Sequence, residues 1–302
     1  MRLFEDPKFN FIHNRKIGYI VSGTLVAISL FAIIFQGLNF GIDFRGGNEV
    51  VVAFQESSPA VGEIRTALTE PLESMPEVKL FGADILIRTD AQLEPNQLRS
   101  IILGTLSTTF PGNQAEIIKL DLVGPRFAED LKQAALMSVI FALIVIFVYI
   151  LVRFKNWTYS TGAVAALAHD VIITLGIFTI FYDILPFNLD IDQALIAAFL
   201  TIVGYSLNDT VVVFDRIREN SLIFKTEAYD SMVNRSINNT MSRTVVTSLT
   251  TFIVVTILFV FGGEVLKGLS FALMLGVILG TYSSIFVASG LLVDLQLKKV
   301  KS

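Results

Sequence analysis

The chain has 302 residues, of which 53% are hydrophobic and 17% are charged, and its formal net charge is -4. This composition is typical of a membrane protein, and a small net charge without a dense basic face argues against nucleic acid as a partner. With no cysteine and only two distant histidines, His13 and His169, the sequence excludes disulfides and offers no metal cluster. We therefore expect no metal and no cofactor.

Six apolar stretches reach or approach the roughly 20 residues that a membrane-spanning helix needs. They are Ile17 to Phe35, Leu131 to Val152, Tyr159 to Phe181, Leu195 to Phe214, Thr244 to Phe261 and Leu269 to Leu291. The first stretch follows Arg15 and Lys16 as a signal peptide would. It is too long for one and lacks a small-residue cleavage site, so we expect a retained anchor.

These stretches predict an α-helical polytopic membrane protein with six transmembrane helices. The expected divisions are an N-terminus at 1–16, a first helix at 17–36, a separate domain at 37–130, and helices two to six at 131–302. A cytoplasmic loop is expected at about 215–243, with a short cytoplasmic tail.

The block at 37–130 has the mixed polar sequence of a small soluble domain. NEVVVAFQ alternates like a strand, and SPAVGEIRTALTEPL opens like a helix. Two further strands, EVKLF and DILIRT, are joined by Gly82 and Ala83 as a tight hairpin. EPNQLRSIILGTLSTTF then predicts a second helix and QAEIIKLDLV a last strand. The order β-α-β-β-α-β predicts a small α+β ferredoxin-like domain.

Enzymatic motifs are missing from the sequence. No phosphate-binding G-x-x-x-x-G-K-[ST] motif occurs, and the glycines of FGGEVLKGL have the wrong spacing. A hydrolytic triad also fails, because His169 is the only histidine beyond the amino terminus and lies inside a predicted span. We expect the protein not to be an enzyme.

Polar residues within three spans need an explanation, because a charge at the centre of a membrane helix costs about 2.5 to 3.5 kcal/mol. His169 and Asp170 lie near the middle of the third span, Asn208 and Asp209 lie in the second half of the fourth, and Arg243 opens the fifth. Spans four and five are antiparallel neighbours, so Asp209 and Arg243 are expected at comparable depths. Burial raises the pKa of a carboxylate and a nearby arginine lowers it, so a small change in geometry would load or release a proton. A proton carrier would be built in this way.

Each of these residues also has a plainer interpretation. Asp209 would be a helix cap if the fourth span ended at Leu207, although the apolar VVVF that follows argues against it. His169 and Asp170 would join helices by hydrogen bonds alone, and Arg243 would extend to the interface. Gly276 and Gly280 form a small-xxx-small pair suited to close helix packing.

Orientation follows from the basic residues of the short loops. With the N-terminus inside, the cytoplasmic side holds most of them: Arg2, Lys8, Arg15, Lys16, Arg153, Lys155, Arg216, Arg218, Lys225, Arg235, Arg243, Lys298, Lys299 and Lys301. The short outer loops then hold Lys267 alone. We expect both termini in the cytoplasm, the block at 37–130 outside, and a multi-pass protein of the inner (plasma) membrane.

A run of motifs in order resembles the SecF members of the SecD/SecF family, within the resistance-nodulation-division superfamily. FGIDFRGG carries the signature residues Gly41, Asp43, Arg45, Gly46 and Gly47. ALAHDVIITLGIF, IVGYSLNDTVVVFDRIREN, SRTVVTSLTTF and FGGEVLKGLSFALMLGVILGTYSSIFVAS resemble the family's successive span motifs. The similarity covers nearly the whole chain.

This resemblance implies an auxiliary subunit of the Sec protein-export translocase that uses the proton-motive force after the ATP-driven stage. The implied partners are SecD, a SecYEG-type channel, YajC/YidC-type membrane proteins, preprotein substrates and membrane lipid. The family's proton-pathway aspartate falls on Asp209, its arginine on Arg243, and a charged third-span position on Asp170. A proton-coupled exporter of lipid or small hydrophobic molecules, and a purely structural scaffold, remain the alternatives.

Overall fold

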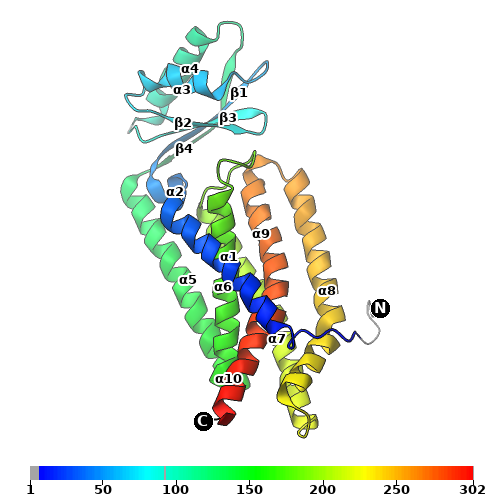
Figure 1. Cartoon of the computed structure of the whole chain (residues 1–302). Helices are drawn as coiled ribbons and strands as arrows, with labels where there is room; N and C mark the ends of the chain where they lie inside the picture. Colours follow the sequence, from blue (N-terminus) through cyan, green and yellow to red (C-terminus); the bar gives the residue numbers. More distant parts are fainter. Residues whose placement is uncertain (1–6, 92, 302) are drawn as a thin grey trace. The chain divides into compact units, whose positions relative to one another are not determined.

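The computed structural model of the chain describes residues 7–91 and 93–301 (Figure 1). It consists of two compact units. One contains the chain up to Leu38, Met137–Ile180 and the chain from Ala194 on, and the other contains Asn39–Leu136 and Phe181–Gln193. Arg2, one of the basic residues expected in the cytoplasm, lies outside the described residues.

The first unit is built from six helices that are long and apolar enough to cross a membrane. Five are continuous: α1 Arg15–Gln36, α5 Pro125–Phe154, α6 Trp157–Ile180, α7 Gln193–Ile223 and α8 Tyr229–Phe261. The sixth consists of α9 Glu264–Ser283, a π-helical turn η1 Ser284–Ala288, and α10 Ser289–Lys301. The expected six transmembrane helices are confirmed.

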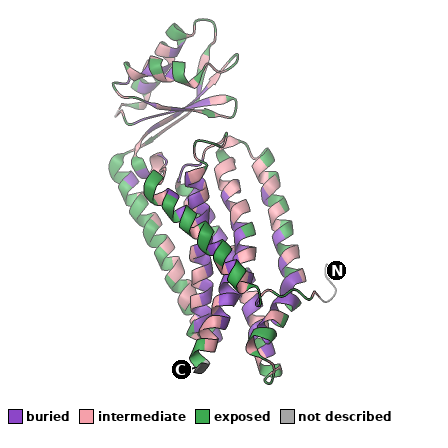
Figure 2. Ribbon diagram, viewed as in Figure 1, coloured by how far each residue is buried: buried purple, intermediate pink, exposed green. Residues whose placement is uncertain are grey.

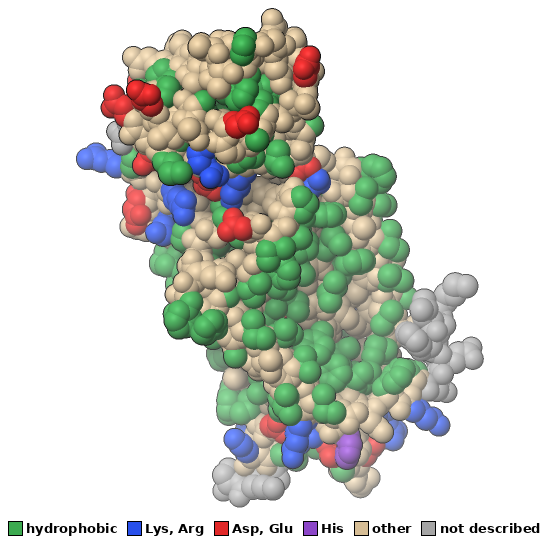
Figure 3. All heavy atoms as spheres, turned by 45° about the horizontal axis from the view of Figure 1, so that its top comes forward, with side chains coloured by type: hydrophobic (Ala, Val, Ile, Leu, Met, Phe, Trp, Pro, Cys, Tyr) green, Lys and Arg blue, Asp and Glu red, His purple; other side chains and the backbone are tan. Residues whose placement is uncertain are grey.

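Burial divides these helices into inner and outer ones, as Figure 2 shows. The third span, α6, contains many buried residues, whereas α5 exposes long apolar side chains such as Phe141 and Val152 along its length. Within the unit α1 packs against α6, and α9 contacts both α6 and α8. Hydrophobic side chains cover the sides of this unit in Figure 3. Such a surface fits the hydrocarbon of a bilayer.

The close packing expected of Gly276 and Gly280 is confirmed. A Cβ atom at Gly276 would collide with the side chain of Ile202 on α7, and one at Gly280 would lie 2.9 Å from the Cβ of Ser206. The two glycines therefore let α9 approach α7 more closely than larger residues would allow. This approach sets the distance between the polar groups described below.

The second unit contains a four-stranded antiparallel sheet in the order β2-β3-β1-β4. Its strands are β1 Gly47–Phe54, β2 Glu77–Phe81, β3 Asp84–Thr89 and β4 Ala115–Val123, and its two longer helices are α3 Val61–Thr69 and α4 Pro95–Thr109. Alternate strand residues such as Val50, Ile85 and Ile87 form one core with Ile64 and Leu98 of the helices. The expected ferredoxin-like order is confirmed.

The other face of this sheet has a cover that the sequence did not indicate. The short helix α2, Ile42–Arg45, and the connection at 181–193 belong to this unit. Phe40 and Ile191 form an isolated parallel bridge, and Ile191 donates its N–H to the carbonyl of Asn39 at 2.8 Å. The connection between the third and fourth spans is therefore part of the small domain.

Two boundaries differ from those expected. The compact small unit extends to Leu136 and adds 181–193, whereas the sequence suggested 37–130. Most of the expected loop at 215–243 is helical, because α7 continues to Ile223 and α8 begins at Tyr229. Charged residues such as Arg216 and Glu219 lie in the last part of α7, beyond its apolar stretch. A helix that has left the bilayer does not need apolar residues there.

Candidate proton site in the membrane helices

Asp170 lies at the centre of a buried hydrogen-bond cluster. Its side chain is fully buried on α6. Its Oδ1 atom lies 2.9 Å from Nδ1 of His169, and its Oδ2 accepts hydrogen bonds from the hydroxyls of Ser206 on α7 and Ser283 on α9, each at 2.8 Å. Two hydroxyl donors and one imidazole nitrogen thus surround the two carboxyl oxygens. Asp170 thus joins three helices through one carboxylate.

Asp209 lies on the continuous part of α7, which excludes the helix-cap interpretation. Its Oδ1 atom accepts a hydrogen bond from the hydroxyl of Thr244 on α8 at 2.8 Å, and both side chains are buried. Its Oδ2 atom is buried and has no partner among the described residues. A buried carboxylate with a free oxygen has room to take a proton or a further donor.

Arg243 and Asn208 lie beside this carboxylate but not in contact with it. Arg243 precedes Thr244 on α8 and is exposed, and within the described part of the chain it forms no ion pair with Asp209. Asn208 precedes Asp209 on α7 and is also exposed. Among the described residues, Asn208 forms no hydrogen bond to another helix. Asn208 reaches the surface of this chain inside an apolar stretch, and Arg243 does so at the start of one.

Sequence reasoning missed the hydroxyl partners of the two carboxylates. Ser206, Thr244 and Ser283 are fully or almost fully buried. Serine and threonine are common in membrane helices, so their presence in the sequence carries little information by itself. The spacing of Ser206 and Asp209, three positions apart on one helix face, was the one available sign.

The signature residues lie in the small unit, where they shape the chain before β1. Gly46 and Gly47 have positive φ angles of 77° and 114°. Asp43 accepts the N–H of Gln193 at 2.9 Å, and Gly41 donates its N–H to Ile191 at 3.0 Å. Arg45 is exposed. Gly41 and Asp43 thus join the start of the small domain to the connection at 181–193, whereas Gly46 and Gly47 shape the entry into the sheet.

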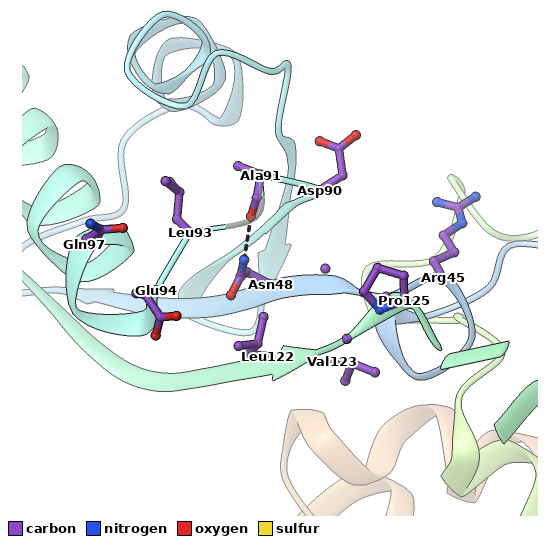
Figure 4. Close-up of a pocket in the computed structure, with 13 residues that line it drawn as sticks. Arg45, Asn48, Asp90, Ala91, Leu93, Glu94, Gln97, Leu122, Val123 and Pro125 are labelled. Carbon is purple, nitrogen blue, oxygen red and sulfur yellow. Dashed lines mark hydrogen bonds between the residues drawn. The ribbon is translucent and has the colours of Figure 1, made fainter. Parts of the chain in front are cut away.

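The small unit contains a cavity of about 550 Å³, and Figure 4 shows the residues that line it. Its lining includes Arg45, Asp90 and Glu94 as well as Leu93. The buried Asn48 donates from Nδ2 to the carbonyl of Ala91 at 2.8 Å, which fixes the loop after β3. The lining therefore mixes charged, polar and apolar side chains.

A buried ion cluster holds the connection at 181–193 against the sheet. Arg88 of β3 lies 2.5 Å from a carboxylate oxygen of Asp190 and 2.8 Å from one of Glu49. Burial alone would lower the pKa of the Arg88 guanidinium, but the charges of Asp190 and Glu49 outweigh it and raise that pKa above its ordinary value. Arg88 therefore stays charged within the cluster.

Tyr182 completes this cluster from the connection itself. Its hydroxyl donates to Asp190 at 2.8 Å and to Glu77 at 3.0 Å, and Lys79 lies 3.5 Å from the centre of its ring. Burial and the nearby carboxylates raise the pKa of the Tyr182 hydroxyl. Burial also acts to raise the pKa of Glu77, but Lys79 and Arg88 lower it overall. Within residues 7–91 and 93–301, no group of three His, Asp or Glu side chains could hold a metal ion.

Family models match the chain in two places. The model described as protein export membrane protein SecD/SecF, C-terminal, matches residues 101–298, and the SecD/SecF GG motif matches residues 31–57. The second match contains Gly46 and Gly47.

Curated relatives match at nearly full length. The chain is 54% identical to the protein translocase subunit SecF of Rhodothermus marinus over 297 residues, which cover 98% of this chain and 96% of the relative. It is 44% identical to the subunit of the same name from Desulfurispirillum indicum, with 94% and 90% of the two chains covered.

A solved structure shares the whole architecture. The crystal structure of SecDF from Thermus thermophilus, described as a translocon-associated membrane protein, matches with a TM-score of 0.87 at 34% identity. The match covers 97% of this chain and 39% of that one, so this chain spans about two-fifths of the length of the SecDF chain. A second SecDF structure, in a super-membrane-facing form, matches with a TM-score of 0.73. The fold, the two family models and the full-length relatives agree, and the chain belongs to the SecD/SecF family of protein export membrane proteins.

Proposed function

We propose that this chain is an accessory subunit of a protein-export translocase, acting with a SecD-type partner to use the proton gradient for preprotein movement. Full-length relatives are named protein translocase subunit SecF, and the matching structures are of SecDF. The proposed role is that of a coupling device: the small domain responds to events in the membrane helices. A SecYEG-type channel and YajC/YidC-type proteins complete the proposed assembly.

The observation that carries the proton-coupled part is the free oxygen of Asp209. A carboxylate deep in a membrane helix is costly, and a scaffold has no use for one. Asp209 keeps one buried oxygen unpartnered while Thr244 holds the other. One proton that descends a potential of about 100 mV releases roughly 2.3 kcal/mol, which suffices to rearrange such a site. We infer that Asp209 takes up and releases a proton in each cycle.

Asn208 and Arg243 support a partner subunit beside α7 and α8. Both are exposed on this chain within spanning helices, where polar groups that face lipid are costly. A SecD-type subunit with polar groups of its own would cover them. In this assembly Arg243 and His169 with Asp170 form the rest of the proton pathway. The proposed site residues are therefore Asp209, Arg243, Asp170, His169 and Asn208.

The membrane orientation is also a proposal. Figure 3 shows Lys and Arg side chains at one end of the helical unit, below the apolar sides. Basic residues near span ends favour the cytoplasm, so this end is proposed as cytoplasmic, with both termini on that side. The small domain is then extracytoplasmic, in a protein of the inner (plasma) membrane.

Asp209→Asn tests the proposed function. Asparagine keeps the shape of the side chain and accepts the Thr244 hydroxyl, but it cannot take up a proton. In vesicles that contain the translocase, the partner and this chain, the proton-gradient-dependent part of preprotein export is expected to fall at least about tenfold. Export driven by ATP alone should not change.

Asp215→Asn is the matched control on the same helix. Asp215 pairs with Arg153 at 2.9 Å and is partly exposed, so its loss should leave the proton dependence intact. If Asp209→Asn assembles with the partner and retains full proton-dependent export, the proton-coupling proposal fails and a scaffold role survives. The lipid-exporter alternative has less support, because the lining of the cavity in the small domain includes the charged side chains of Arg45, Asp90 and Glu94.

A further inference from the structure

The sixth span contains an irregular turn that the family resemblance left without a role. Between α9 and α10 the helix widens into the π-helical turn η1, Ser284–Ala288. Single π turns inside α-helices interrupt the regular hydrogen bonding and often lie at functional sites. Here the carbonyl of Ser284 accepts both the N–H and the hydroxyl of Ser289, the latter at 2.8 Å. The carbonyl of Ser284 is thus satisfied twice within the turn.

Two successive serines at this turn hold two different helices. Ser283 donates to the Asp170 carboxylate of α6 at 2.8 Å, and the hydroxyl of Ser284 lies 2.8 Å from that of Thr210 on α7. Both serines are fully buried. Thr210 follows Asp209 directly in the sequence, so the pair of serines links the two carboxylate-bearing helices.

Neighbouring helices are built to admit this turn. A Cβ atom on Gly162 of α6 would lie 2.8 Å from the carbonyl oxygen of Ala288, so glycine at this position lets η1 approach α6. Gly280, one turn before Ser284, likewise lets α9 approach Ser206 of α7. The close approach places both serine hydroxyls within hydrogen-bond distance of their partners.

Ser283 has a second acceptor within reach. Besides Asp170, its hydroxyl lies 3.3 Å from the carbonyl oxygen of Gly280. That carbonyl already accepts the N–H of Ser284 and its hydroxyl, the latter at 2.8 Å. A hydroxyl of Ser283 that turned to Gly280 would therefore compete with Ser284 for the same oxygen.

A proton on Oδ2 of Asp170 would favour this rotation of the Ser283 hydroxyl. An ionised Oδ2 accepts two hydroxyls, from Ser206 and Ser283, whereas a protonated Oδ2 also donates and has less capacity to accept. Of the two serines, Ser283 has an alternative acceptor, the carbonyl oxygen of Gly280. The displaced hydroxyl of Ser284 would alter its contact with Thr210, next to Asp209.

We propose that the π-helical turn at Ser284–Ala288 is the positioning element that transmits the charge of Asp170, through Ser283 and Ser284, to α7 at Asp209. This inference rests on the proposed proton-coupled function and names its internal connection. Other titratable groups nearby are His169 on α6, Tyr282 of α9, whose ring stacks on His169 at 6.1 Å, and Asp209 on α7. In the described part of the chain, His169 is the one ionisable partner paired with Asp170.

Ser283→Ala tests the connection, with Ser270→Ala as the matched control. Ser270 is fully buried on the same helix, and its hydroxyl donates to its own helix, at Leu266. A hydrogen bond to a charged group contributes about 1.5–3 kcal/mol. Ser283→Ala is therefore expected to lower proton-dependent export about tenfold, Ser283→Thr to restore most of it, and Ser270→Ala to leave it unchanged.

A titration separates positioning from simple packing. The infrared band of the protonated Asp170 carboxyl, identified by its loss in Asp170→Asn, is followed against pH in the purified full chain. Ser283→Ala should displace the midpoint by about one pH unit or more, since one unit corresponds to 1.36 kcal/mol. Ser270→Ala should not displace it. This measurement needs no export activity, only a folded protein.

The outcomes distinguish this inference from the proposed function. An unchanged midpoint together with normal proton dependence in Ser283→Ala overturns the π-turn proposal while leaving the role of Asp209 intact. Conversely, full proton-dependent export in Asp209→Asn overturns the proposed function. The double variant Asp170→Asn with Ser283→Ala should be no worse than Asp170→Asn alone, and additive losses would also refute the connection.

Discussion

Gly47 shows how a single residue determines the start of the small domain. Its φ angle of 114° is one that side-chain-bearing residues rarely adopt, and a Cβ atom there would lie 2.8 Å from the carbonyl oxygen of Thr89. β1 pairs with β3 from Asn48 onward, so the glycine allows the chain to enter the sheet beside the end of β3. The double glycine of the signature is therefore explained by backbone geometry.

Gly47→Ala is expected to destabilise the small domain by about 2–4 kcal/mol, because it adds backbone strain to a collision with a fixed carbonyl. Urea-dependent proteolysis of the full chain in detergent would measure the loss. Gly62→Ala is the control, since Gly62 lies in α3 with no atom within 4 Å of an added Cβ. That variant should be as stable as the parent or slightly more stable. Equal stability of the two variants would contradict this account of the signature.

Polar residues inside the helices were identified from the sequence more reliably than their partners were. An Asp in an apolar stretch is visible without a structure, because its cost in the membrane demands an explanation. Its partner is not visible: Ser283 lies 113 positions from Asp170, and many other hydroxyls compete for the assignment. The same holds for Arg243. The sequence predicted that Arg243 and Asp209 lie at comparable depths on neighbouring helices, but it did not predict that the Arg243 side chain is exposed.

At the scale of elements, the connection at 181–193 behaves as part of the small domain. It carries Tyr182 and Asp190 into the ion cluster around Arg88, and α6 and α7 are its two ends. The connection is continuous in sequence with α6 and α7, the helices that hold Asp170 and Asp209. Because titratable side chains form this cluster, we expect the stability of the attachment between the connection and the sheet to depend on pH.

Glu77→Gln tests this attachment. Because the folded pKa of Glu77 lies below its ordinary value, its contribution to stability is fully present above about pH 4.3 and is lost as the pH falls through the folded pKa. The melting temperature of the small domain, followed by circular dichroism of the full chain, should fall more steeply between pH 5 and pH 3 in the parent than in Glu77→Gln.

Glu63→Gln provides the comparison for that experiment. Glu63 is exposed on α3, so this variant should follow the parent at every pH. Parallel curves for all three proteins would show that Glu77 does not hold the connection. At alkaline pH the dependence of stability on pH has the opposite sign. The pKa of the Tyr182 hydroxyl is raised, and so is the pKa of Lys119, which lies on β4 and pairs with Glu49. The small domain should therefore lose stability as the pH rises above about 10.

Elements were predictable from the sequence where a local pattern defines them. Apolar stretches gave the six spans, and alternation with turn residues gave all four strands, because burial imposes these periods on the chain. The π-helical turn was not predictable, since one extra residue per turn leaves no recognisable period in TYSSIFVAS, where small polar and apolar residues are mixed. Nor was the attachment of 181–193, because its partners in the sheet lie about a hundred residues earlier.

For the whole molecule, the proposed topology is open to a direct test, because the chain contains no cysteine and needs no prior substitution. Thr108→Cys introduces a thiol on the exposed side of α4 in the small domain, and Thr226→Cys introduces one between α7 and α8. In intact spheroplasts, a membrane-impermeant maleimide is expected to label Thr108→Cys and to leave Thr226→Cys unlabelled until the membrane is permeabilised.

The physical reason for this expectation is the distribution of basic residues. A connection near Arg216, Arg218 and Lys225 is held on the cytoplasmic side, while a long domain is translocated largely regardless of its charge. The parent chain, without a thiol, measures the background. Labelling of Thr226→Cys before permeabilisation would show that the topology is the reverse of the proposed one. It would also place Asp209, in the second half of α7, near the outer surface, so that protons from outside would reach it without crossing most of the membrane.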